Sequence, residues 1–176
     1  MGLNYVNLDD VTRRYMSEEI EFDMEHQNFH SSNFLNEHGK SVWPSLLAEA
    51  VQHNDDWLAN EIQRRGMLAS HYPRRKSGST ETTMVKVPVT AAQTMAEGEF
   101  NRLYARGLCA RAIAEHIISV EVYRARYSAT PREESQRMIG TRFLPQDILQ
   151  DLRSHPGIES ALSIPGGPNS GISIKL

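Results

Sequence analysis

Two histidines have the spacing that comes closest to metal chemistry in this sequence. His26 and His30 stand four positions apart, and Glu37 and His38 follow nearby, so the group contains ligand types that zinc accepts. The glutamate that a metalloprotease helix places between its two histidines is absent, and Asn28 indicates that the helix is already ending there. We therefore expect solvated histidines and no metal site.

Motifs for a nucleophile or a phosphate are equally weak. Cys109, the single cysteine, falls on the apolar part of a predicted helix, where burial would raise the pKa of its thiol rather than activate it. The glycine-rich run from Gly166 to Gly171 is not followed by a helix, as a phosphate loop would be. Glu121 has Tyr123 where a metal-dependent nuclease would carry a lysine. The sequence thus predicts no catalytic residue, no cofactor and no enzymatic activity.

The cations are mostly arginines, and they concentrate in the second half of the chain. Arginine outnumbers lysine 15 to 4, and eight arginines face only four carboxylates between Arg102 and Arg142. The planar guanidinium group suits bidentate pairing with carboxylate or phosphate. We therefore expect a surface that binds protein or nucleic acid. Its candidate residues come from one predicted loop, one helix and one strand face: Arg74, Arg75, Lys76, Arg102, Arg106, Arg124 and Arg126.

The segment from Asp9 to Glu25 carries the opposite charge, with seven carboxylates against two arginines. One interpretation is that this acidic segment docks on the Arg-rich part of the same chain or faces water. The other is that complementary patches join neighbouring copies, or join the protein to a partner, by charge-matched docking. For the second interpretation, the candidate interface residues are Glu18, Glu19 and Glu21.

Apolar periodicity predicts the elements that must position these side chains. The clearest is a helix from Ala91 to about His116, where apolar residues recur at spacings of four and three. Gly98 and Gly107 lie inside it at a cost to helix stability, so we expect a neighbouring element to approach closely there. Further helices are predicted at residues 8–26, 44–51, 55–66 and 145–154, and strands at residues 82–89, 119–127 and 172–176.

The segments between these elements are predicted to be irregular. Residues 27–40 are interpreted as a loop or a short irregular turn, residues 128–143 as a connection with room for one helical turn, and residues 69–81 as an exposed basic loop. The resulting class is α+β, with N-terminal helices packed beside a small sheet and one long central helix. The predicted division is a helical segment at 1–68, the basic loop at 69–81 and an α+β part at 82–176, with one domain overall as the alternative.

The composition of the chain limits the classes of protein to which it can belong. The chain has 176 residues, of which 39% are hydrophobic and 23% charged, and its net charge is −3, as in an ordinary globular domain. Its longest apolar runs fall far short of the roughly 20 residues needed to span a bilayer. A single cysteine fits a reducing compartment. We therefore expect a cytoplasmic protein, or one assembled in a phage particle, without a membrane partner.

These observations favour binding over catalysis. The stretch from Val87 to Ala125 is similar in its pattern of residue types to bacterial and phage-borne open reading frames. We expect a non-enzymatic binding or structural protein, a subunit of a larger bacterial or phage-type assembly that self-associates or binds a protein partner. The alternative is an adaptor or regulator that contacts nucleic acid through its Arg-rich surface.

Overall fold

The predicted elements follow one another in the predicted order, with helices first and strands concentrated later. The structure adds a helix at Glu133–Met138 and strands at His71–Arg75 and Arg142–Phe143, in segments that were expected to be a connection and a loop. The structure is a computed structural model that describes residues 2–75, 78, 80–157, 160–167 and 169–176. The helices among these residues are α1 (Asp10–Glu25), α2 (Glu37–Ala50), α3 (Asp55–Arg64), α4 (Ala91–Ala114), α5 (Glu133–Met138) and α6 (Pro145–Ser154). The strands are β1 (His71–Arg75), β2 (Thr82–Lys86), β3 (Val120–Arg124), β4 (Arg142–Phe143) and β5 (Ile172–Lys175).

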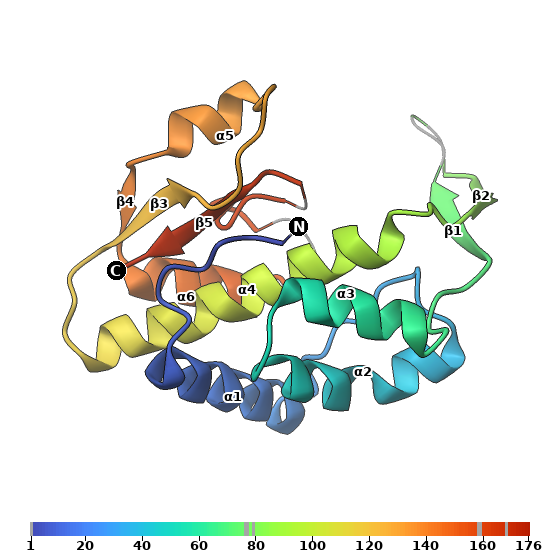
Figure 1. The fold of residues 1–176 in the computed structure, drawn as a ribbon, viewed down its shortest axis with the longest axis horizontal. Helices are drawn as coiled ribbons and strands as arrows, with labels where there is room; N and C mark the ends of the chain where they lie inside the picture. Colours follow the sequence, from blue (N-terminus) through green and yellow to red (C-terminus); the bar gives the residue numbers. More distant parts are fainter. Residues whose placement is uncertain (1, 76–77, 79, 158–159, 168) are drawn as a thin grey trace.

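Helix α4 is the centre of the molecule. It lies between the layer formed by α1, α2 and α3 and the three-stranded sheet, and it contacts α1, α3, α6 and β5 (Figure 1). Its predicted apolar stripe is buried at Ala96, Phe100 and Leu103. Burial of this kind contributes about 25 cal/mol per Å² of apolar surface. The α+β class with one long central helix is therefore confirmed.

Gly107 shows why α4 contains a glycine in its interior. A Cβ atom at this position would lie 2.8 Å from the backbone nitrogen of Met16 in α1, closer than Cβ atoms approach other groups. The close approach predicted at Gly107 is therefore present, and the neighbouring element is α1. Cys109 is fully buried on the same helix, as predicted, and burial raises the pKa of its thiol.

The three-stranded sheet is antiparallel, with the order β4-β3-β5. Strand β5 pairs with β3 so that Val122 faces Ile174, and both side chains are buried. Asn101 of α4 anchors β5 through two hydrogen bonds. Its side-chain Nδ2 donates to the carbonyl of Ile172 at 2.9 Å, and its Oδ1 accepts from the Ser173 hydroxyl at 2.6 Å. The predicted terminal strand at residues 172–176 is thus present and anchored to the central helix.

The segment predicted as an exposed basic loop differs from the prediction. Residues His71–Arg75 form β1, which pairs with β2 in a separate two-stranded sheet. The hairpin extends away from the body of the molecule (Figure 1). The strand was not predictable from its own residues, because β1 lacks apolar alternation and is defined only by its partner strand.

Helix α2 also begins earlier than predicted. Residues 37–40 were expected to be irregular and Pro44 to lie in the first helical turn, yet α2 starts at Glu37. The side chain of Asn36 accepts a hydrogen bond from the Gly39 amide at 2.7 Å, which satisfies one of the free donors of the first turn. This N-cap sets the true beginning of the helix.

Candidate functional site

The acidic helix and the Arg-rich half of the chain meet inside the molecule. Arg106 of α4 donates from Nε to Glu19 Oε2 at 2.9 Å and from Nη1 to Asp23 Oδ2 at 2.6 Å. Arg153 of α6 donates to the other oxygen of Glu19 at 2.5 Å. Arg106 is 7% exposed and Glu19 is 2% exposed. This network therefore joins α1, α4 and α6 within one chain and does not present Glu19 or Arg106 to a partner.

The other two acidic candidates stay on the surface. Glu18 and Glu21 are exposed on α1, and Glu18 makes a long ion pair of 3.8 Å with Arg14 one helical turn earlier. Exposed pairs of this kind contribute only about 0 to 1 kcal/mol. Of the three residues expected at an acidic interface, two are thus accessible and Glu19 is structural.

The predicted arginine surface is divided among separate internal contacts. Arg102 donates to the carbonyl of His155 at 2.5 Å, and Arg124 donates to that of Ser170 at 2.9 Å. Arg126 pairs with the buried carboxylate of Glu97. Arg102 and Arg124 hold the segment after α6 against α4 and β3, and Arg126 joins the end of β3 to α4. They do not form one face with the hairpin cations, because each bonds to a different part of its own chain.

The remaining predicted cations lie on the hairpin. Arg74 and Arg75 are exposed at the end of β1, while Lys76 lies outside the described residues. Thr83 faces Arg74 and Thr82 faces Arg75 across the pair of strands. The hairpin is therefore the part of the described chain where predicted binding residues remain accessible together.

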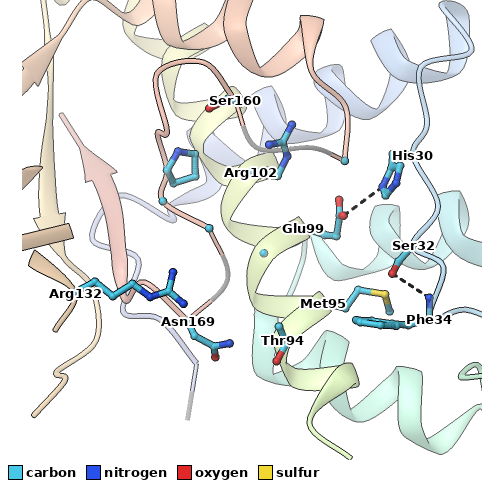
Figure 2. A pocket seen from close by; sticks show the side chains of 15 residues that line it. His30, Ser32, Phe34, Thr94, Met95, Glu99, Arg102, Arg132, Ser160 and Asn169 are labelled. Carbon is cyan, nitrogen blue, oxygen red and sulfur yellow. Dashed lines mark hydrogen bonds and ion pairs between the residues drawn. The ribbon is translucent and has the colours of Figure 1, made fainter. Parts of the chain in front are cut away.

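A cavity of about 490 Å³ lies beside α4, at a place that the sequence did not predict (Figure 2). One wall comes from the segment between α1 and α2, and the other from Arg132, which precedes α5, and from the segment that follows α6. Helix α4 forms its floor. Polar side chains from all of these parts line the cavity: His30, Ser32, Thr94, Glu99, Arg102, Arg132, Ser160 and Asn169.

His30 and Glu99 face each other at one side of this cavity. Nδ1 of His30 lies 3.7 Å from Oε1 of Glu99, which is too far for a hydrogen bond. The imidazole packs directly on Gly157, where any side chain would overlap with the ring. His26 is not part of this group, since its Nδ1 lies 2.8 Å from the carbonyl oxygen of Phe22. The described residues contain no cluster of three His, Cys, Asp or Glu side chains able to hold a metal ion.

Two carboxylates position the chain segment that closes the cavity. Asp151 of α6 accepts from the amides of Ala161 and Leu162 at 3.0 and 2.8 Å. Glu97 of α4 accepts from the amide of Asn169 at 3.0 Å. Burial raises the pKa of Asp151, but these amide donors outweigh it and leave the pKa below its ordinary value. The wall of the cavity is thus fixed at both of its ends.

Replacing Asp151 by asparagine is expected to lower the free energy of unfolding by about 1.5 to 3 kcal/mol at pH 7, the usual contribution of hydrogen bonds to a charged group. Because the folded-state pKa of Asp151 is lowered, its contribution is present above about pH 4 and is lost as the pH falls through that lower pKa. Urea unfolding of both proteins at pH 7 and in acid measures the difference. The difference in stability between wild type and Asp151→Asn should shrink in acid. The exposed control Glu25→Gln should show no such difference from wild type. Equal stability of wild type and Asp151→Asn at pH 7 would contradict the assignment.

Sequence reasoning missed the cavity because its residues are scattered along the chain. Gly98 lines the cavity floor, and the close approach expected there stays a prediction. The glycine-rich run that begins at Gly166, which was considered only as a phosphate loop, also forms part of a wall. Both glycines drew attention in the sequence, but neither indicated that the two segments line one cavity.

Comparisons with protein-family models, with curated protein sequences and with solved structures give no match to this chain. Within the described residues, the helices are all too short or too polar to cross a membrane. The hairpin and the cavity are the two candidate sites among the described residues.

Proposed function

We propose that this chain is a non-enzymatic binding protein, a subunit of a larger assembly, and that the β1–β2 hairpin makes the assembling contact. The supporting observation is the exposure of the hairpin. Among its strand residues only Tyr72 and Val85 are partly buried, and Tyr72 packs edge-on against Phe34 at 4.7 Å. A two-stranded hairpin with little core of its own is marginally stable in water, so a partner surface would stabilise it.

One face of the hairpin carries an exposed apolar pair. Met84 is 65% exposed and lies opposite the exposed Pro73 across the two strands. Among the described residues, no layer covers the side chains on this face, since alternate residues point to opposite sides and the partly buried pair lies on the other side. An exposed apolar pair on a protruding element is typical of a protein contact.

The two edges of the hairpin differ in their capacity to accept another strand. The Val87 amide donates to the carbonyl of Ser70 at 3.0 Å, and hydrogen-bonded pairs alternate along an antiparallel ladder. The backbone groups that point outward on β1 are therefore those of His71, Pro73 and Arg75. On β2 they are those of Thr82, Met84 and Lys86. Proline has no amide hydrogen and blocks the β1 edge. No described strand pairs with the β2 edge.

The occupant that fits this edge is a second copy of the chain. An antiparallel pair of β2 strands with its two-fold axis at Met84 would place Thr82 opposite Lys86 of the partner subunit. No like charges would then face each other, and the two Met84 side chains would meet at the centre. Such isologous strand pairing is a common way for identical chains to associate.

Met84→Pro tests this contact directly. The Met84 amide points outward, so proline removes a donor from the β2 edge while the hairpin's own hydrogen bonds remain. We expect the mass measured by light scattering to fall to that of a 19.9 kDa monomer, with an unchanged circular dichroism spectrum. The double variant Arg74→Ser/Arg75→Ser leaves the edge intact and should keep the assembled mass. An assembled mass that survives Met84→Pro would contradict the proposed contact.

The exposed cations of the hairpin favour a second candidate function, contact with nucleic acid. Arg74, Arg75, His71 and Lys86 are all exposed on one narrow antiparallel ribbon, and the major groove of DNA admits such a ribbon. This function predicts a gel shift that weakens steeply with salt and disappears in the Arg74→Ser/Arg75→Ser variant. Retention of the shift by that variant, or no shift at low salt, would exclude it.

A further inference from the structure

Met84 is the most exposed of the methionines that the structure describes. It is 65% exposed in the middle of β2, and Met24 of α1 follows at 50%. The other described methionines are withdrawn from water, either inside the core or packed against it: Met16, Met67, Met95 and Met138. An oxidant dissolved in water therefore reaches two thioethers of the described chain more readily than the rest.

The single cysteine does not compete for such an oxidant. Cys109 is fully buried in α4, and burial raises the pKa of its thiol. Little of the reactive thiolate therefore forms. A methionine thioether reacts without losing a proton, so exposure decides which methionine is oxidised first. On the hairpin, Met84 is the side chain that an oxidant changes.

The surroundings of Met84 suit an apolar side chain. Across the hairpin it faces Pro73, whose nitrogen carries no hydrogen to donate. Thr82 and Lys86 are its neighbours on the same face of β2, two positions away on either side. In the proposed pair of β2 strands, the side chain directly opposite is Met84 of the partner subunit. The two closest neighbours of the thioether are thus apolar.

Pairing of the β2 edges does not hide this side chain from water. An added strand lies in the plane of the sheet, whereas side chains project from the two faces. No layer covers the Met84 and Pro73 face in the part of the chain that the structure describes. An oxidant therefore reaches Met84 in both the free and the assembled protein.

We infer that oxidation of Met84 to its sulfoxide weakens the contact between β2 strands and thereby regulates assembly. The inference rests on the proposed function, because it concerns the same contact. Hydrogen peroxide is a sufficient oxidant. The sulfur lone pair attacks one peroxide oxygen, an S–O bond forms as the O–O bond breaks, and the second oxygen leaves as water with both protons. The sulfur is oxidised by two electrons and the peroxide is reduced by two.

The sulfoxide weakens the contact because it is polar. Its oxygen needs hydrogen-bond donors, and neither Pro73 nor the second sulfoxide of the pair provides one. The two S–O dipoles also meet at the two-fold axis. Loss of an apolar cross-strand pair is expected to raise the dissociation constant of the assembled form by about fivefold or more. Methionine sulfoxide reductases restore the thioether, so the change is reversible.

Light scattering before and after treatment with hydrogen peroxide tests the inference, with peptide mass spectrometry to locate the added oxygen. We expect oxidation at Met84 and Met24, and a shift of the assembled mass toward 19.9 kDa at fixed concentration. Unoxidised Met84, or oxidised Met84 with an unchanged dissociation constant, would overturn the inference and leave the proposed contact standing. A protein that is monomeric before treatment would overturn both.

Three variants assign the effect to one side chain. Met84→Gln introduces a polar side chain of similar length and should weaken assembly without any oxidant. Met84→Leu cannot take up oxygen, so its dissociation constant, whatever its value, should be the same before and after peroxide. Met24→Leu, the matched control on α1, should respond to peroxide as wild type does. Circular dichroism checks that each variant is folded. A peroxide response retained by Met84→Leu would overturn the assignment.

Discussion

Replacing Arg106 by methionine is expected to lower the free energy of unfolding by about 3 to 5 kcal/mol. The substitution keeps most of the side-chain volume but removes the guanidinium that bonds to both Glu19 and Asp23. Both carboxylates belong to buried residues of α1, so they would remain in the interior without their shared cation. Arg153 would still pair with Glu19, and Asp23 would lose the larger share of its stabilisation. Urea unfolding followed by circular dichroism measures the loss.

Arg14→Met is the matched control for this prediction. Arg14 also pairs with a glutamate of α1, Glu18, but both side chains are more than half exposed and 3.8 Å apart. Its removal should change stability by no more than about 1 kcal/mol. A similarly small loss for Arg106→Met would mean that the buried network does not hold α1 on α4.

Leu103→Ala is expected to destabilise the protein by about 2 to 5 kcal/mol, the usual effect of shortening a buried leucine. Leu103 is buried on α4 and belongs to the continuous apolar core, which also includes Ile20 of α1 and Leu152 of α6. The truncation would leave a cavity where these helices meet. Because α4 contacts elements on both of its sides, its surroundings have little freedom to collapse into the space.

Ile118→Ala provides the comparison for the core substitution. Ile118 is 81% exposed just beyond α4, and its truncation should change the free energy of unfolding by less than about 0.5 kcal/mol. Thermal and urea unfolding of both variants give the two values. If Leu103→Ala were no more destabilising than Ile118→Ala, α4 would not be the core helix.

The local part of the fold was predictable from the sequence because its signals are local. The spacing of Ala96, Phe100 and Leu103 predicted α4, and Gly107 predicted the close approach that Met16 makes. Strand β1 gave no such signal, since its residues are mostly polar and its pairing with β2 defines it. The start of α2 was misplaced because Pro44 was taken as a first-turn residue, whereas Asn36 is the N-cap.

The candidate sites were less predictable, because they depend on which distant residues meet. Charge counting showed that an acidic helix and an Arg-rich half exist, but not that Arg106 reaches Glu19 across 87 positions of sequence. The same counting grouped Arg124 with Arg74, although one bonds to the chain's own backbone and the other is exposed on the hairpin. The cavity combines side chains from several segments, and only the fold brings Glu99 and Arg132 to one space.

The mass of the wild-type protein in solution, measured by light scattering over a range of concentrations, tests the proposed assembly most directly. Pairing of β2 edges predicts a mass of at least twice 19.9 kDa at high concentration, with dissociation toward the monomer on dilution. A mass of 19.9 kDa at every concentration would contradict self-association through the hairpin.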